Sequence, residues 1–431
     1  MAKTANGLKV RLDPADEYPH PPGDAKNYNE SMYFNVFDPA KMIGGWFRIG
    51  NRPNERYAEV SVCVYLPDGR VAFTFGRPAI EGNAEMNAGG LKVSVVEPFK
   101  RLKVSYEGKA LLLARPHEMA DPKKAYRDNP SVACTIELDY VGLSPMFGGE
   151  TVNADGTPLA VDPEKSFAKA HYEQHCAASG VMTVDGERHV IAGFGLRDKS
   201  WGPRHWQAIE WYRWCPMNFG RDFGMMLSVI GDGAGGVRQG GMVFRDGIYD
   251  LITECEIDSD WDENGYQTAL RARVKTAAGK DYRVTGRVLS LIPLRNRRKG
   301  PDGVELHTRI TEGMTEYRCG DLVGYGLSEY LDQIVDGEPN GKAAGYSPCG
   351  PLDKPPPPRG GLFRLASPGR MFDDASLVGR VEMNDAKTDQ AERFPRRTLR
   401  RQNTRARILR SAMRLFRQVG YGAATMNAIA D

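Results

Sequence analysis

The chain has 431 residues, of which 41% are hydrophobic and 26% are charged, with a formal net charge of +3; this is typical of a globular protein of about two to three domains. No apolar run approaches the roughly 18 residues that span a bilayer, and residues 1–10 lack the apolar core of a signal peptide. These features argue against a membrane-spanning, secreted or disordered protein, and we expect a cytoplasmic location.

Residues 30–335 contain a succession of short segments that favour β-strands. Residues 58–66 are rich in β-branched side chains, a turn-forming Pro-Asp-Gly sequence follows, and residues 71–75 form a second apolar run. Asp-Gly and Asn-Gly pairs recur along the region, and they supply the positive φ angles that tight hairpin turns need. We therefore expect a mainly β fold, built as antiparallel sandwiches or barrels.

A weak internal repeat favours two related β domains. Residues 45–48 (Gly-Trp-Phe-Arg) precede one predicted strand and residues 210–213 (Glu-Trp-Tyr-Arg) precede another, and both strands end in a turn that contains Asp-Gly. Chance similarity is the alternative. We expect an N-terminal extension, two β domains, a proline-containing and partly disordered linker, and a helical C-terminal segment, at residues 1–29, 30–165, 166–335, 336–403 and 404–431.

A polar stretch at residues 171–175 alternates along a predicted strand. In such a strand His171, Glu173 and His175 project from the same face. Two imidazoles and a carboxylate could line a polar pocket, where they would position water or relay protons, or they could bind a divalent metal ion. An exposed polar row is the third interpretation. We favour the pocket lining and expect no metal site.

The densest group of aromatic and charged residues lies at 193–214. Four of the six tryptophans fall here, and buried tryptophans shape a core or a pocket. An aspartate among such rings, Asp198, would have a raised pKa and could act as a general acid. Pairing with an arginine would instead lower its pKa and make it structural, and the sequence leaves both open. We expect a substrate pocket shaped by other members of this group: Arg197, Trp201, Arg204, Trp206, Trp211 and Tyr212.

The motif Asp-x-Ser-Trp-Gly-x-Arg at residues 198–204 also carries a family resemblance, together with residues 29–31, 47–55 and 324–330. The chain resembles the lipocalin-like family that includes carotenoid 1,2-hydratase (hydroxyneurosporene synthase) and AttH-type proteins, and more closely its uncharacterised bacterial members with two such domains. The resemblance implies two antiparallel β-barrel or sandwich domains around an apolar ligand site. Lys199 stands where the family pattern has histidine, so a cation replaces a titratable base.

The C-terminal segment is strongly basic, whereas the remainder of the chain is mildly acidic. Residues 396–431 hold nine arginines and one acidic residue, and residues 404–419 follow an amphipathic helical pattern. Residues 404–430 resemble the opening of a tetracycline-repressor (TetR) type DNA-binding domain, in which the recognition helix would follow, but the chain stops at Asp431. We expect a truncated or fused remnant that does not read DNA, with weak phosphate binding by the arginines as the alternative.

The family resemblance, taken with these polar and aromatic groups, implies a hydratase or cyclase-type enzyme, a lyase or an isomerase, that acts on a lipophilic isoprenoid, steroid or polyketide-like molecule. We expect it to need no organic cofactor. In this hypothesis Asp198 donates the proton, His171, Glu173 and His175 position water or return the proton, and aromatic faces stabilise a cation. The first alternative is a non-catalytic carrier of hydrophobic molecules. The second is a ligand-responsive regulator with a vestigial DNA-binding tail. The pocket could lie inside one barrel or between the two.

Overall fold

The computed structural model describes residues 2–3, 8–163, 165–231, 236–299 and 303–342. The predicted TetR-like segment at 404–431 and most of the predicted linker lie outside the described residues. Lys3–Leu352 forms one compact unit. Within the described ranges, no helix has the length and apolarity that crossing a bilayer requires.

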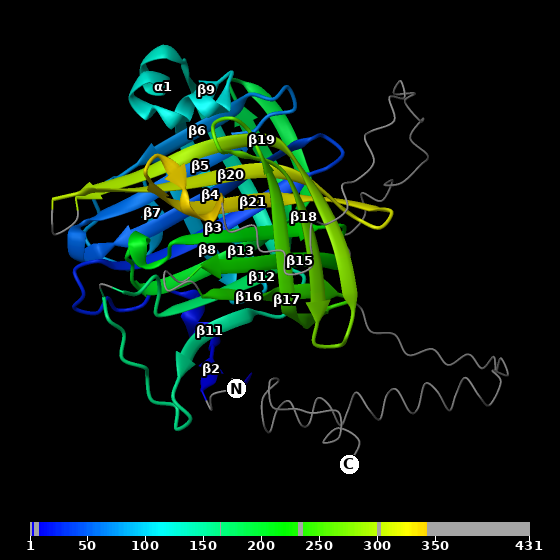
Figure 1. The fold of residues 1–431 in the computed structure, drawn as a ribbon. Helices are drawn as coiled ribbons and strands as arrows, with labels where there is room; N and C mark the ends of the chain where they lie inside the picture. The colour runs from blue at the N-terminus through cyan, green and yellow to red at the C-terminus, as the bar shows by residue number, and fades with distance from the viewer. Residues whose placement is uncertain (1, 4–7, 164, 232–235, 300–302, 343–431) are drawn as a thin grey trace, which may run out of the picture. The chain divides into compact units, whose positions relative to one another are not determined.

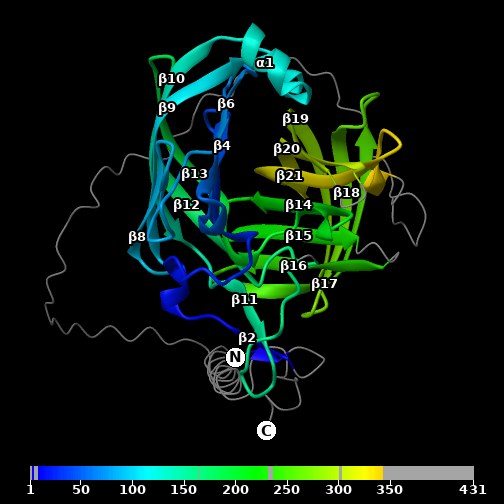
Figure 2. The same ribbon diagram turned by 90° about the vertical axis from the view of Figure 1, so that its left-hand side faces the viewer.

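The N-terminal half of this unit forms a 13-stranded antiparallel sheet, drawn in blue to green in Figures 1 and 2. Its strands are β1 (Ala2–Lys3), β2 (Lys9–Arg11), β3 (Tyr28–Asp38), β4 (Ile43–Arg52), β5 (Tyr57–Tyr65), β6 (Val71–Gly76), β7 (Met86–Ala88), β8 (Leu91–Glu97), β9 (Arg101–Leu113), β10 (Ser131–Gly142), β11 (Phe147–Val152), β12 (Ala170–Val184) and β13 (Glu187–Pro203). An α-helix, α1 (Pro122–Asp128), lies between β9 and β10. Short 3-10 helices cover Pro14–Glu17, Pro53–Glu55 and Pro116–Ala120.

The second sheet has nine antiparallel strands. They are β14 (Trp211–Asn218), β15 (Phe223–Gly231), β16 (Val237–Arg245), β17 (Ile248–Trp261), β18 (Gln267–Thr276), β19 (Asp281–Lys299), β20 (Glu305–Cys319), β21 (Leu322–Val335) and β22 (Glu338–Pro339). Short 3-10 helices at Trp206–Ala208 and Asn340–Lys342 flank the sheet in the sequence.

Both sheets close on themselves. In the second sheet, β14 pairs with β21 as well as with β15, so the strands from β14 to β21 form a barrel. In the first sheet, β10 pairs with both β9 and β12, which closes a ring of β12, β13, β3, β4, β5, β6, β9 and β10. The structure thus confirms the predicted mainly β, antiparallel, lipocalin-like class.

The change from one sheet to the other falls between β13 and β14. The predicted domain division at residues 165 and 166 lies between β11 and β12, which pair with each other in the first sheet. The predicted catalytic residues lie on β12 and β13, and both of these strands belong to the first barrel. The division of the chain into domains stays a prediction.

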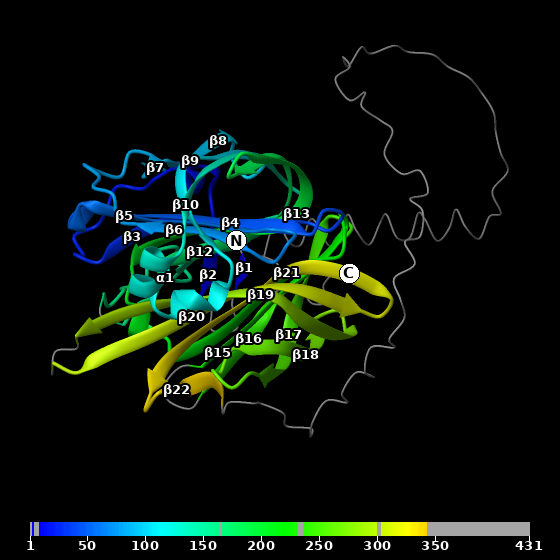
Figure 3. The same ribbon diagram turned by 90° about the horizontal axis from the view of Figure 1, so that it is seen from above.

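Period-two alternation along the strands separates two kinds of core. Phe34, Val62 and Ile136 belong to a cluster inside the first barrel, and Met225 and Val243 to a cluster inside the second. Residues of opposite parity point outward, and the outer faces of the two barrels pack on each other. This interface cluster joins Tyr33, Trp46, Tyr65 and Phe73 of the first barrel to Ile292, Met314 and Leu327 of the second. Seen from above, the two barrels lie against each other (Figure 3).

Candidate active site

A cavity of about 810 Å³ lies between the outer faces of the two barrels. Strands β3 to β6, β12 and β13 of the first barrel contribute side chains, and so do β14 to β16 and β19 to β21 of the second. Helix α1, which lies at the top of Figure 2, contributes Pro122 and Tyr126 to the wall. The sequence left open whether the pocket lies inside one barrel or between the two, and in the structure the cavity lies between them.

The greater part of the wall is apolar and rich in aromatic rings. Tyr33 and Trp214 meet edge to face at a centroid distance of 5.6 Å, and Trp46 and Phe73 lie 6.1 Å apart. Phe167 and Trp206 form another edge-to-face pair at 5.5 Å. Further apolar lining comes from Met119, Phe147, Ile209, Met226, Ile230, Leu294 and Ile310. Such walls favour a hydrophobic or aromatic ligand.

Two neighbouring strands of the first barrel bring His171, Glu173 and Asp198 together. Glu173 on β12 is directly opposite Asp198 on β13, and His171 is two residues from Glu173 on the same face. The Nε2 atom of His171 lies 3.9 Å from Glu173 Oε1 and 3.9 Å from Asp198 Oδ2. The imidazole therefore sits between the two carboxyl groups at the edge of the cavity.

Glu173 is the most deeply buried of the three. Its side chain is 1% exposed, against 20% for Asp198 and 47% for His171. Burial raises the pKa of Glu173 from its ordinary value of 4.5 to about 7, although the charge of His171 and a hydrogen bond from Trp214 oppose the shift. Trp214 Nε1 donates that bond to Glu173 Oε1 at 2.6 Å, across the boundary between the barrels. A carboxyl group in this state titrates near neutral pH.

The pKa of His171 is raised above its ordinary value of 6.5. Burial acts to lower it, but the adjacent carboxyl groups of Asp198 and Glu173 raise it by more. The imidazolium form is therefore favoured while either carboxylate is charged. Because His171 and Glu173 influence each other, a proton gained or lost by one of them changes the affinity of the other for protons.

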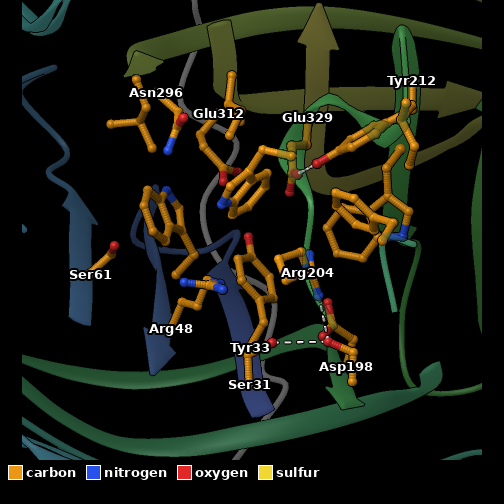
Figure 4. A pocket seen from close by; sticks show the side chains of 18 of the residues that line it. Ser31, Tyr33, Arg48, Ser61, Asp198, Arg204, Tyr212, Asn296, Glu312 and Glu329 are labelled. Atoms are coloured by element: carbon orange, nitrogen blue, oxygen red, sulfur yellow. Dashed lines mark hydrogen bonds between the residues drawn. The ribbon is translucent and has the colours of Figure 1, made fainter. Parts of the chain in front are cut away.

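A second acidic pair lies on the opposite wall, on the second barrel. Glu312 on β20 and Glu329 on β21 are register partners, so their side chains share one face of the sheet. Burial raises the pKa of Glu329 to about 7, and burial together with the charge of Glu329 raises the pKa of Glu312 further above its ordinary range. The Tyr212 hydroxyl donates a hydrogen bond to Glu329 (Figure 4). Two adjacent buried carboxyl groups do not both ionise readily, so the pair retains a proton near neutral pH.

Two arginines of the first barrel reach the same cavity, Arg48 on β4 and Arg204 just after β13. Arg48 Nη1 lies 3.5 Å from Glu59 Oε2. Arg204 Nη2 donates a hydrogen bond of 2.8 Å to Ser200 Oγ, which in turn lies 3.0 Å from Ser31 Oγ. In Figure 4 these cations lie on the side of the cavity opposite Glu312 and Glu329.

Six of the residues predicted from the sequence line the cavity: His171, Glu173, Asp198, Arg204, Trp206 and Tyr212. The predicted strand at residues 171–175 is β12. His175 shares the face of His171 and Glu173, but it lies deeper between the barrels, where its ring stacks on Phe244 at 5.4 Å and burial lowers its pKa to about 4. His175 is therefore neutral and does not line the cavity.

Three other predicted pocket residues, Arg197, Trp201 and Trp211, do not line the cavity either. Arg197 and Trp201 differ from Asp198 by an odd number of residues, so the strand turns them to the opposite face. There Arg197 forms a buried ion pair with Glu17 at 2.8 Å, and Trp201 stacks on His20. Trp211 packs in the core of the second barrel, whereas its neighbour Tyr212 faces the cavity.

Arg197 does not form the ion pair with Asp198 that was one alternative from the sequence, because the carboxylate partner of Arg197 is Glu17. Lys199, at the position of the family histidine, also points away from the cavity and pairs with Glu30 at 2.8 Å. The position at which the family has histidine therefore does not line the cavity of this chain.

The sequence analysis missed the second-barrel acids and Arg48. Glu312 and Glu329 lie on β20 and β21, which are consecutive along the chain, and the register between these strands places the two residues side by side. The sequence analysis did not derive that register. Arg48 belongs to the repeated Trp-containing segment, but nothing there indicated which way it points.

The described residues include no group of three histidine, cysteine or acidic side chains arranged to hold a metal ion. His171 Nε2 lies 3.9 Å from an oxygen of each neighbouring carboxyl group, which is the spacing of an ion-paired cluster. The donor set supports proton transfer directly, because an acid, a base and an imidazole meet at one point.

Comparisons with known proteins place these observations in context. A sequence profile of the family described as "Domain of unknown function (DUF7064)" matches residues 13–334. The comparison with curated proteins finds no match. Three solved structures are similar to the chain at low identity. Kievitone hydratase from Nectria haematococca has 10% identity and a TM-score of 0.45, with 77% of this chain and 96% of that chain covered. A putative AttH from Nitrosomonas europaea has 12% identity and a TM-score of 0.45, with 77% and 98% covered. CghA with Sch210972 has 12% identity and a TM-score of 0.42, with 71% and 88% covered.

Proposed function

The chain belongs to the DUF7064 family, and we propose that it is an enzyme of the hydratase or cyclase type, which moves protons on an apolar ligand held between its two barrels. The observation that carries this proposal is the buried carboxyl group of Glu173, with a pKa of about 7, in the wall of an aromatic cavity. A group that titrates near neutral pH is suited to give and take a proton during turnover.

We favour Glu173 over Asp198 as the proton donor. The side chain of Glu173 is 1% exposed and that of Asp198 is 20% exposed, so water competes less for the proton of Glu173. The Trp214 bond fixes one oxygen of Glu173, and its other oxygen, Oε2, is buried without a hydrogen-bond partner. A ligand in the cavity would supply the missing contact.

Protonation of a carbon–carbon double bond by Glu173 would leave a cation in the cavity. The faces of Trp214, Tyr33 and Trp206 surround that space, and aromatic faces attract positive charge. In a hydration, water would then add to the cation and release its proton to Asp198. In a cyclisation, a second double bond would add instead and the proton would leave from carbon.

His171 would complete the cycle. Its Nε2 atom lies 3.9 Å from each carboxyl group, so a small movement would let it carry the proton from Asp198 back to Glu173. The net reaction in the hydration is then the addition of one water molecule, with all protein groups restored. His175, which the sequence grouped with these residues, would take no part because it is turned toward Phe244.

The ligand class follows from the cavity and from the sequence resemblance. A volume of about 810 Å³ is suited to a molecule of drug-like size. The resemblance implies isoprenoid, steroid or polyketide-like substrates, which have the apolar surface that this wall would cover. A non-catalytic carrier of such molecules is the alternative, and it would use the same cavity.

The experiment that tests the proposal is native mass spectrometry on the purified protein after incubation with an extract of its source organism. A retained lipophilic molecule identifies the ligand class. A change in the mass of that molecule during incubation, by one water for a hydratase, supports the enzyme. A ligand that is retained and never altered supports the carrier and contradicts the enzyme.

Once a reaction is observed, Glu173→Gln tests the donor. We expect turnover to be lost while ligand affinity stays within a few-fold, because glutamine keeps the shape and the Trp214 contact but holds no exchangeable acid proton. Glu137→Gln, an exposed carboxyl on β10, is the matched control and should leave turnover unchanged. Full turnover in Glu173→Gln would refute the assignment.

A further inference from the structure

The permanently cationic residues of the described cavity wall are all of one type. Among the described residues that line the cavity, every Lys or Arg position is an arginine: Arg48, Arg77, Arg204, Arg238, Arg295 and Arg297. Arginine presents a planar fork of donors that matches the oxygens of a carboxylate, which a lysine ammonium does not.

Three of the outer arginines are already paired. Arg77 lies 3.1 Å from Glu59, Arg295 lies 3.9 Å from Asp121, and Arg297 lies 3.4 Å from Glu305. These contacts are at the partly exposed rim, where they account for the charges without a ligand.

Arg204 is different because it is buried and lacks a carboxylate partner. Its residue exposure is 8%, and none of the described acidic side chains lies within ion-pair distance of it. The Ser200 hydroxyl accepts one hydrogen bond from Nη2, and Nε has no partner. Its guanidinium carbon lies 4.0 Å from the centre of the Phe167 ring and 5.3 Å from that of Trp206. A cation held among rings with open donors is costly unless an anion reaches it.

Arg48 adds a second, incompletely paired cation beside it. Its Nη2 atom is buried without a partner, and Glu59, its nearest carboxylate, is shared with Arg77. The guanidinium carbon of Arg48 lies 5.7 Å from the Trp206 ring, which Arg204 also approaches. Burial and the charge of Arg48 lower the pKa of Arg204 to about 10, which shows that the two cations repel each other.

We propose that Arg204 and Arg48, with the hydroxyl groups of Ser31 and Ser200, form a subsite for a carboxylate, so that the ligand is a lipophilic acid with its rings or chain in the aromatic part of the cavity. The inference deepens the proposed function, on which it rests, by naming the substrate class of the same cavity. The carboxylate would satisfy the open donors of both arginines and relieve their repulsion. The acidic pair on the opposite wall retains a proton, which lowers the negative charge that the apolar part of the ligand meets there.

The test uses the full chain and a matched pair of fluorescent probes, pyrenebutyrate and its methyl ester, which share the ring and the chain and differ in the charge of the head group and in one methyl group. We expect the wild-type protein to bind the acid about tenfold more tightly than the ester. Arg204→Gln should bring the two affinities together by weakening the acid, while the affinity for the ester stays within about twofold.

Two further variants keep the test decisive. Arg48→Gln should reduce the preference for the acid in the same direction and serves if Arg204→Gln does not fold. Arg101→Gln, an exposed arginine on β9 that pairs with Asp139 and does not line the cavity, is the matched control and should keep the preference. Equal binding of acid and ester by the wild type, or an unchanged preference in the folded Arg204→Gln and Arg48→Gln variants, would overturn the carboxylate subsite and leave the cavity intact. Failure of both probes to bind would instead remove the ligand cavity itself, and with it the proposed function.

Discussion

Glu173 shows how one residue links stability to chemistry. In the folded protein this carboxyl group is buried, and burial favours its neutral form, whereas in the unfolded chain the group is exposed to water. Burial therefore keeps the acid protonated at the pH at which it would have to work, and the same burial makes its ionised form unfavourable in the folded protein.

The first prediction concerns the pH dependence of stability. Since the pKa of Glu173 is about 7 in the folded protein and 4.5 ordinarily, folding holds its proton more tightly, and this stabilisation is lost as pH rises through about 7. Glu173→Gln removes the cost of the charge, so we expect a higher free energy of unfolding than the wild type at alkaline pH, by up to about 3 kcal/mol, and a small difference below the ordinary pKa. Urea unfolding at both pH values measures this, with Glu137→Gln as control. A difference that does not depend on pH would contradict it.

The second prediction concerns the acidic pair on the second barrel. Because the charge of Glu329 contributes to the raised pKa of Glu312, Glu329→Gln should lower the pKa of Glu312 while burial still holds it above its ordinary value. Infrared titration of the carboxyl stretch reports the shift. Glu316→Gln, on the same strand but ion-paired with Arg318, is the control and should leave Glu312 unchanged. If the pKa of Glu312 is the same in the Glu329→Gln variant as in the wild type, the two carboxyl groups do not interact.

At the scale of single residues, local sequence carried about half of the candidate site. His171 and Glu173 were found because they alternate along a predicted strand, and Asp198 and Arg204 because they lie in a segment rich in tryptophan. Glu312 and Glu329 could not be found in that way, because their meeting depends on the register between β20 and β21. Which charged groups fold next to Asp198 is likewise not determined by any spacing in the sequence.

At the scale of the strand, β13 serves two structures at once. Its even-numbered residues Asp198 and Ser200 face the cavity. Its odd-numbered residues Arg197 and Lys199 face the N-terminal segment, where they form buried ion pairs with Glu17 and Glu30. Alternation was predictable, but the sequence analysis grouped residues of both parities into one pocket, which is why Arg197 and Trp201 were misplaced.

The third prediction tests the outward face of β13. Lys199 Nζ also donates hydrogen bonds to the carbonyl oxygens of Asp16 and Tyr18, at 2.6 and 2.7 Å, so the N-terminal segment is anchored to this strand. Lys199→Met would leave the carboxyl group of Glu30 buried without its ammonium partner, and we expect a loss of about 3–5 kcal/mol in unfolding free energy. Denaturant unfolding measures the loss.

The double variant Lys199→Met with Glu30→Gln is the control for this prediction, and it should recover part of the stability because the unpaired charge is removed. The affinity for pyrenebutyrate should stay close to that of the wild type in the double variant, since neither residue lines the cavity. A stability loss that the second substitution does not reduce would argue against the ion pair as its cause.

At the scale of the whole unit, the two barrels depend on each other. The Tyr65 hydroxyl of the first barrel donates a hydrogen bond of 2.8 Å to the carbonyl oxygen of Glu312 in the second, and Trp214 reaches back to Glu173. The sequence predicted two barrel-like bodies but not their arrangement, because periodicity tells which side chains point outward and not which outward faces meet.

The fourth prediction follows from this interface. We expect circular dichroism and tryptophan fluorescence to give one coincident unfolding transition, because the interface cluster holds side chains of both barrels. Tyr65→Phe should move the whole transition by about 1 kcal/mol through the loss of one buried hydrogen bond. Tyr106→Phe, whose hydroxyl bonds Lys109 within the first barrel, is the control and should also move the whole transition. Two phases, with only one displaced, would show that the barrels unfold separately.

The composition of the cavity wall has a consequence for reactive molecules. Across the wall that the structure describes there is neither a lysine nor a cysteine, so a ligand meets no primary amine and no thiol. Aldehydes, enones and epoxides, which elsewhere form imines with lysine or add to cysteine, would pass through this space without being captured by either reaction. We therefore expect that an electrophilic ligand in this cavity does not modify the protein through an amine or a thiol of the wall.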